Sequence, residues 1–97
     1  MILNEKQEEI FARALKAQGI EREAMQALEE MAELTKEILK NIIRKKDNRD
    51  CIAEELADVY VTLEQVRRMY GFSEEEIQKI ADEKIDMLGK RLDAAKA

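Results

Sequence analysis

The chain has 97 residues, enough for a single domain with a modest core. Charged side chains make up 40% of it and the net charge is −5, so binding to duplex nucleic acid is not expected, because basic side chains must neutralise the phosphates. Histidine is absent and Cys51 is the single cysteine, which excludes the usual zinc sites and histidine-based catalytic centres. A metal here would have oxygen ligands, as Mg²⁺ and Mn²⁺ do.

Two helices are predicted in the first half of the chain. Asn4 is a suitable N-cap for a helix that runs to about Gln18 and ends at Gly19. A longer helix is predicted from about Glu21 to Lys45, because apolar residues recur there at helical spacing. These apolar residues cover roughly half of the helix circumference at about 100° per residue. That arc is wide for one packing contact, so we expect part of it to form an oligomer interface.

Two more helices are predicted in the second half. Residues 46–50 carry turn and capping residue types, and the third helix follows them and ends at Gly71. The start of the fourth helix has the clearest signal, because Ser73 and Glu76 form a capping-box pattern. This helix is expected to end near Asp93.

Four helices joined by short turns predict an all-α fold, an antiparallel four-helix bundle that forms one domain over residues 1–97. A domain this small buries only part of its surface, which favours a homodimer or a homotetramer. The N-terminal residues lack the apolar core of a signal peptide, and no segment approaches the ~18 apolar residues that cross a membrane. We therefore expect a cytoplasmic protein with no membrane contact.

Acidic residues on the second and third predicted helices stand out. Glu30, Glu33 and Glu37 lie on one side of the second helix, because residues three and four apart are neighbours. A solvated charged face is the simpler interpretation of these three. On the third helix, Glu55 lies at the edge of the apolar stripe with Asp58 beside it, where an unpaired charge is costly to bury. Glu55 is therefore either exposed at that edge or compensated by a cation.

Two basic residues interrupt the apolar stripe of the fourth predicted helix. Lys84 lies within the stripe, and Arg91, two turns later, points almost the same way. Long basic side chains can bury their stems while the charged groups stay in water. The alternative is that both cations meet an anion in the groove of the bundle.

Carboxylates three residues apart on facing helices can converge on one point, as they do in carboxylate-bridged metal bundles. Because histidine ligands are missing, such a cluster would favour Mg²⁺, which is often bound together with substrate phosphates. The sequence therefore predicts a metal and phosphate site between the second and third helices.

Two short motifs carry a resemblance to a known family. Residues 28–34 read LEEMAEL and residues 54–59 read EELADV, which gives Glu29-Glu30-x-x-Glu33 and Glu55-x-x-Asp58 with 21 residues between them. These motifs resemble the EExxE and ExxD motifs of the all-α NTP pyrophosphohydrolases, a superfamily that includes MazG and the dimeric dUTPases. The resemblance extends from about residue 18 to residue 92.

The resemblance implies an enzyme that depends on Mg²⁺, with Mn²⁺ as a substitute, and hydrolyses a nucleoside triphosphate to the monophosphate and pyrophosphate. By motif position, the implied metal ligands are Glu30, Glu33, Glu55 and Asp58. The implied catalytic residues are Glu29, which would orient the attacking water, and Glu33. To these we add four basic residues as candidates for phosphate contact: Lys84, Arg91, Lys36 and Lys40.

Two other functions fit the same sequence. One is a catalytically inactive, homo-oligomeric helical module for interaction or regulation, whose acidic faces serve only solubility. The other is a carboxylate bundle that binds metal without hydrolase activity, a class that usually contains histidine ligands. Aromatic residues are only 4% of the chain, and no base-stacking pocket can be recognised, so the preferred base is not predicted.

Overall fold

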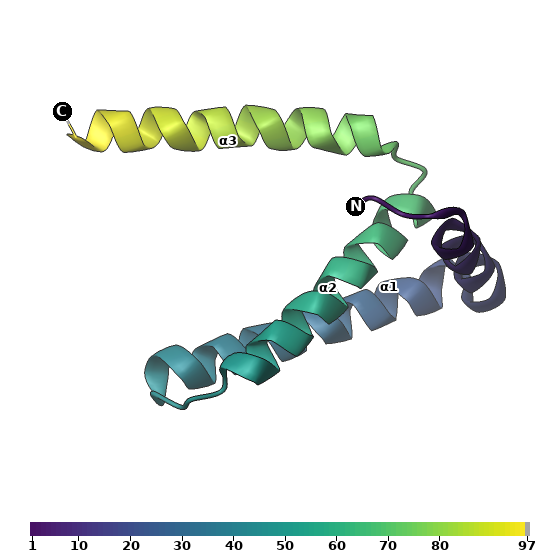
Figure 1. Cartoon of the computed structure of the whole chain (residues 1–97), viewed down its shortest axis with the longest axis horizontal. Coiled ribbons are helices and arrows are strands. Elements are labelled where there is room, and N and C mark those ends of the chain that lie inside the picture. Colours follow the sequence, from purple (N-terminus) through teal and green to yellow (C-terminus); the bar gives the residue numbers. More distant parts are fainter. Residues whose placement is uncertain (97) are drawn as a thin grey trace.

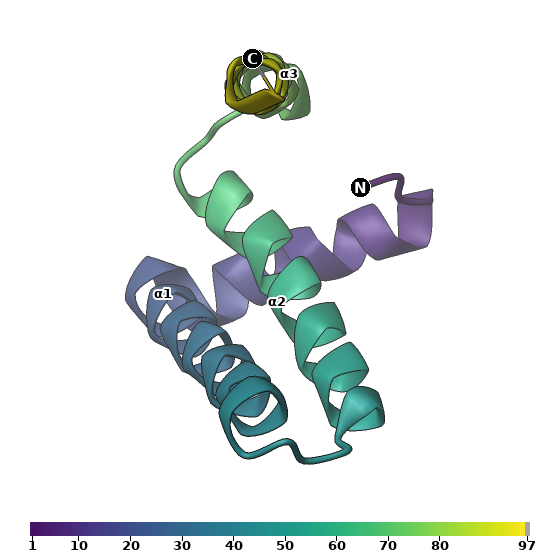
Figure 2. The same cartoon turned by 90° about the vertical axis from the view of Figure 1, so that its left-hand side faces the viewer.

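The computed structural model describes residues 1–96, which form three helices: α1 (Glu5–Ile43), α2 (Arg49–Met69) and α3 (Glu74–Lys96) (Figure 1). The prediction of an all-α fold is confirmed, but the predicted number of four helices is wrong. The first two predicted helices are joined into α1 at Gly19, which has non-helical dihedrals of φ 81° and ψ 165°. The predicted break is thus a kink, and the segments on its two sides run in different directions (Figure 2).

Local hydrogen bonds fix the starts of two helices. Asn4 Oδ1 accepts a hydrogen bond from Gln7 N at 2.8 Å, and Gln7 Oε1 accepts one from Asn4 N at 3.1 Å. At α3, Ser73 Oγ accepts from Glu76 N at 3.1 Å, and Glu76 Oε2 accepts from Ser73 N at 3.2 Å. Both are reciprocal capping boxes, which satisfy backbone N–H groups that a helix start leaves without partners. Both predicted starts are confirmed.

Helices α1 and α2 pack as an antiparallel hairpin, whereas α3 runs away from it (Figures 1 and 2). One chain therefore does not build the predicted four-helix bundle. The N-terminal segment of α1 is tied to the end of α2 instead. Arg68 lies over the ring of Phe11, with its guanidinium carbon 5.3 Å from the ring centroid, and also pairs with Glu8. This cation–π contact and ion pair hold the segment before Gly19 against the hairpin.

The contact between α1 and α2 is largely polar. Among residues 1–96, the buried hydrophobic residues are Ala27, Val59 and Met69, and the buried polar residues are Glu23, Asn48, Thr62, Glu64 and Gln65. Of the expected apolar stripe of α2, Val59 is buried, whereas Leu56 and Leu63 are 56% and 49% exposed. The hairpin thus has a polar seam and apolar outer faces.

The predicted apolar stripe of α3 is also exposed along its length. None of the helices within residues 1–96 holds an apolar segment long enough to cross a membrane.

Candidate metal centre

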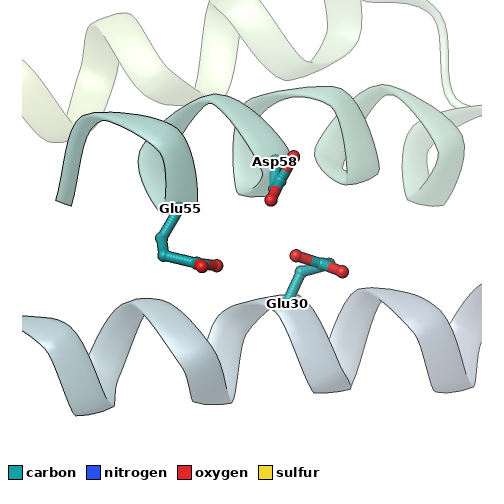
Figure 3. A group of neighbouring side chains, drawn as sticks. All are labelled: Glu30, Glu55 and Asp58. Carbon is teal, nitrogen blue, oxygen red and sulfur yellow. The ribbon is translucent and has the colours of Figure 1, made fainter. Parts of the chain in front are cut away.

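Three carboxylates converge where α1 and α2 cross. Glu30 comes from α1, and Glu55 and Asp58 come from adjacent turns of α2 (Figure 3). One carboxylate oxygen from each residue lies within 4.8 Å of those of the other two. The antiparallel pairing produces this arrangement, because the three-residue spacing of Glu55 and Asp58 turns both side chains towards α1.

The charges in this cluster oppose one another. Partial burial raises the pKa of Glu30, and the nearby carboxylates of Asp58 and Glu55 raise it further. The pKa of Glu55 is also raised, by partial burial and then by the charges of Asp58 and Glu33. Among residues 1–96, no lysine or arginine forms an ion pair with Glu30, Glu55 or Asp58. The cluster therefore favours a bound cation or a bound proton.

The donor set fits a hard divalent cation. All three ligand groups are carboxylates, the type that Mg²⁺ and Mn²⁺ prefer. Asp58 is exposed, while Glu30 and Glu55 are half-buried, so water or phosphate oxygens have access to the remaining coordination positions. Mg²⁺ usually keeps several such ligands.

The three converging residues do not include the other two glutamates of the predicted site. Glu33 is exposed and is not one of the three converging residues, although its charge is close enough to raise the pKa values of Glu30 and Glu55. Glu29 is also exposed, and it borders a shallow depression together with Arg22 and Gln26. The motif positions gave Glu30, and not Glu29, as a metal ligand, and Glu30 is the one of the two that joins the cluster.

The structure does not bring the four predicted phosphate-binding cations to the carboxylates. Lys84 and Arg91 are exposed on α3, which has no extended packing contact with α1 or α2. Lys36 and Lys40 border an apolar groove formed by α1 alone, and Lys40 Nζ lies 3.3 Å from Glu37 Oε1.

One buried carboxyl group was not anticipated from the sequence. Glu23 is only 1% exposed, and neither of its carboxyl oxygens has a hydrogen-bond partner within residues 1–96. Burial raises the pKa of this side chain. Glu23 precedes Glu30 by seven residues, as Glu30 precedes Glu37, so the three share one face of α1. That repeat was the signal available in the sequence.

Glu37, the third of these residues, has a structural role. The buried Asn48 side chain donates from Nδ2 to the Glu37 backbone oxygen at 2.9 Å and to Glu37 Oε2 at 2.6 Å. The hydrogen bond from Asn48, followed by the contact with Lys40, lowers the pKa of Glu37. Asn48 therefore links the start of α2 to α1 and satisfies a carboxylate that the metal cluster does not use.

Comparisons with protein-family models, curated proteins and solved structures found no match for this chain.

Proposed function

We propose that this protein is a Mg²⁺-dependent nucleoside triphosphate pyrophosphohydrolase that releases a nucleoside monophosphate and pyrophosphate. The observation that carries the proposal is the convergence of Glu30, Glu55 and Asp58 from two helices, with no basic partner within residues 1–96. These three residues occupy motif positions that resemble the metal-binding positions of the all-α pyrophosphohydrolases.

The carboxylates have distinct proposed tasks. Glu30, Glu55 and Asp58 would hold Mg²⁺ through their oxygens, and the bound ion would polarise the phosphate and lower the pKa of a coordinated water. Glu33 is exposed beside the cluster. We propose that its carboxylate accepts the proton of the attacking water and, as the motif implies, also contacts the metal. The exposed side of the cluster is the entrance for a polyphosphate.

The proposed phosphate contacts involve oligomer formation. Lys84 and Arg91 lie on a helix that does not pack against its own hairpin, so they would reach a polyphosphate only in an assembly of several chains. A homodimer or homotetramer is therefore part of the proposal, as is a cytoplasmic location, where nucleoside triphosphates are abundant.

The test is pyrophosphate release from canonical and modified ribo- and deoxyribonucleoside triphosphates, with Mg²⁺ and with EDTA. Mg²⁺-dependent release that Glu55→Gln removes would support the proposal and show the preferred base. Glu54→Gln is the matched control, because Glu54 is the exposed neighbour of Glu55 and is not one of the three converging residues. Equal activity of both variants, or no release by a folded sample, would refute the proposal.

A second candidate is the inactive homo-oligomeric interaction module. The apolar side chains on the outer faces of the hairpin and on α3 favour it, because they call for a protein partner whether or not a metal binds. A folded oligomer that shows neither Mg²⁺ stabilisation nor pyrophosphate release would be this module.

A further inference from the structure

Three glutamates of α1 face α2 at steps of seven residues, and they differ in what surrounds their charges. Glu37 accepts a hydrogen bond from Asn48 Nδ2 at 2.6 Å. Glu30 belongs to the carboxylate cluster, which favours a bound cation or proton. Glu23 is 1% exposed, and within residues 1–96 its carboxyl oxygens have no hydrogen-bond partner and form no ion pair. An ionised Glu23 is therefore the least compensated charge of the three.

The residues of α2 at the level of Glu23 suit a protonated carboxyl group. Seven residues beyond the two α2 members of the carboxylate cluster, α2 carries Thr62 and Gln65, which are both buried. Thr62 Oγ1 donates its hydrogen bond to Val59 O at 2.9 Å. A threonine hydroxyl has a single hydrogen, so it cannot also donate to Glu23, although its oxygen can accept from a protonated carboxyl group. These surroundings therefore favour the neutral form of Glu23.

The charged side chains around Glu23 do not balance its charge. The ion pairs at this end of the molecule join other residues: Arg67 with Glu64, Arg68 with Glu64, and Arg68 with Glu8. The remaining cations between residues 5 and 22 are exposed: Lys6, Arg13, Lys16 and Arg22. Along α1, the next charge on the same face is that of Glu30, which has the same sign. Burial accordingly raises the pKa of Glu23.

The N-terminal segment, residues 5–18, distinguishes the surroundings of Glu23 from those of Glu30 and Glu37. All three glutamates face α2, yet Glu30 and Glu37 are half-buried and Glu23 is fully buried. At this end of the hairpin the N-terminal segment lies beside the end of α2, where Arg68 contacts it (Figure 2). The segment is thus the element that can supply the additional cover.

The attachment of the N-terminal segment allows it to move. Gly19, four residues before Glu23, joins the segment to the rest of α1 with φ 81° and ψ 165°, a conformation that is almost exclusive to glycine. Rotation about Gly19 can therefore move the segment without unwinding either helical part of α1. None of residues 5–18 is fully buried. Segments with so few buried contacts open locally at a low cost in free energy.

We propose that the N-terminal segment is a hinged cover over Glu23, which stays closed while Glu23 carries a proton and opens about Gly19 when that proton is lost. Opening lets water solvate the carboxylate and breaks the contacts of Arg68 with the segment. Each closure takes up one proton from solution. This inference does not depend on the proposed enzymatic function, because it involves neither the metal nor a nucleotide.

The sign of the pH dependence follows from the two states of the cover. The pKa of Glu23 is raised in the closed state and returns to its ordinary value in the open state. Opening is therefore least favourable below pH 4.5. It increases with pH by at most about tenfold per pH unit, and it becomes constant once the pH exceeds the raised pKa.

Hydrogen exchange of the full chain, followed by mass spectrometry between pH 4.5 and pH 8, tests the proposal. EDTA and constant ionic strength exclude metal effects, and the rates are corrected for the intrinsic dependence of exchange on pH. A detached helix as short as residues 5–18 is marginal in water, so opening exposes its amides to exchange. We expect the opening of residues 5–18 to increase with pH and then level off, while residues 49–69 stay protected.

Two variants separate the proton from the hinge. Glu23→Gln keeps the shape of the side chain but cannot ionise, so the opening should stay at its low-pH level at every pH. The matched control, Glu21→Gln, replaces an exposed glutamate two residues earlier and should keep the wild-type pH dependence. Gly19→Ala strains the closed conformation, so the opening should increase about tenfold or more at all pH values, with the same pH dependence.

Three results would overturn the inference. A Glu23→Gln variant that opens with the wild-type pH dependence would show that the proton is bound elsewhere. Loss of protection in residues 49–69 together with residues 5–18 would show that the whole hairpin unfolds. Unchanged exchange in Gly19→Ala would show that the segment does not move about this residue.

Discussion

Glu30 on α1 and Asp58 on α2 face each other across the helix pair, with carboxylate oxygens no more than 4.8 Å apart and Glu55 within the same distance of both (Figure 3). Such an arrangement of acidic groups costs free energy at neutral pH unless a cation or a proton is bound. The stability of the hairpin should therefore respond to metal and to pH in ways that separate a metal site from an ordinary charged face.

Removing one carboxylate should stabilise the metal-free protein and abolish its stabilisation by metal. In EDTA, Glu55→Gln should raise the melting temperature, because it relieves repulsion from Asp58 and Glu33. In Mg²⁺, wild-type protein should melt higher, by about 4–8 °C for each kcal/mol of binding free energy, and the variant should lose this shift. Thermal melts at constant ionic strength measure both effects. Glu54→Gln should retain the full Mg²⁺-induced shift in melting temperature. If Glu55→Gln also retained the full shift, Glu55 would be excluded as a metal ligand.

The pH dependence of metal-free stability should have an unusual sign. The pKa values of Glu23, Glu30 and Glu55 are raised above 4.5, so the folded state holds these protons more tightly than the unfolded state. The stabilisation is complete below pH 4.5 and is lost as the pH rises through the raised pKa values. Glu37 acts in the opposite direction, because its lowered pKa adds stability above pH 4.5 that disappears as the pH falls.

Urea unfolding at a series of pH values in EDTA measures this dependence. We expect Glu37→Gln to steepen the loss of stability with rising pH, and Glu30→Gln to reduce it. A Glu30→Gln variant whose stability depends on pH in the same way as that of the wild type would contradict the raised pKa of Glu30.

Replacing the buried Glu23 should stabilise the fold. Its carboxyl oxygens have no hydrogen-bond partner in the described part of the chain, and leaving a buried polar group unpaired costs about 1–3 kcal/mol. Glu23→Leu should therefore raise the free energy of unfolding at neutral pH by an amount of that order, as measured by urea denaturation. Glu21→Leu, two residues earlier and exposed, should change it little. Destabilisation by Glu23→Leu would show that the carboxyl group has a partner.

Replacing Asn48 should lower the free energy of unfolding more than replacing a typical asparagine does. Asn48→Ala removes two hydrogen bonds to Glu37 and leaves its carboxylate less satisfied, so we expect a loss of about 1.5–3 kcal/mol in unfolding free energy. Asn41→Ala removes only one exposed hydrogen bond, from Asn41 Nδ2 to Lys46 O at 3.2 Å, and should cost clearly less. Equal losses in the two variants would mean that Asn48 does not link α2 to α1.

Two glycine substitutions should have opposite signs. Gly71 has φ of 72°, so Gly71→Ala should destabilise the turn by about 1–2 kcal/mol, although within residues 1–96 the added Cβ meets nothing within 4 Å beyond its two chain neighbours. Gly89 lies inside α3 with equally open space, and Gly89→Ala should stabilise that helix by about 0.5–1 kcal/mol. Thermal melts followed by circular dichroism compare the two. A neutral Gly71→Ala would show that the turn is not held in this conformation.

The sequence by itself determined the features that depend on near neighbours. The capping boxes at Asn4 and Ser73 involve residues three positions away, so both helix starts were predictable. The motif positions also placed Glu30, Glu55 and Asp58 among the candidate metal ligands, together with Glu33, which is not one of the three converging residues.

Only the tertiary structure decided which helix faces meet. Apolar residues line two sides of α1, so periodicity did not reveal that its carboxylate-bearing face packs on α2 while Leu28 and Ile43 stay outside. The burial of Glu23 and the direction in which α3 leaves Gly71 were likewise decided only by the tertiary structure. The physical reason is that the local pattern fixes the shape of each helix, whereas the choice of packed face depends on the combined free energy of all surfaces that can be covered.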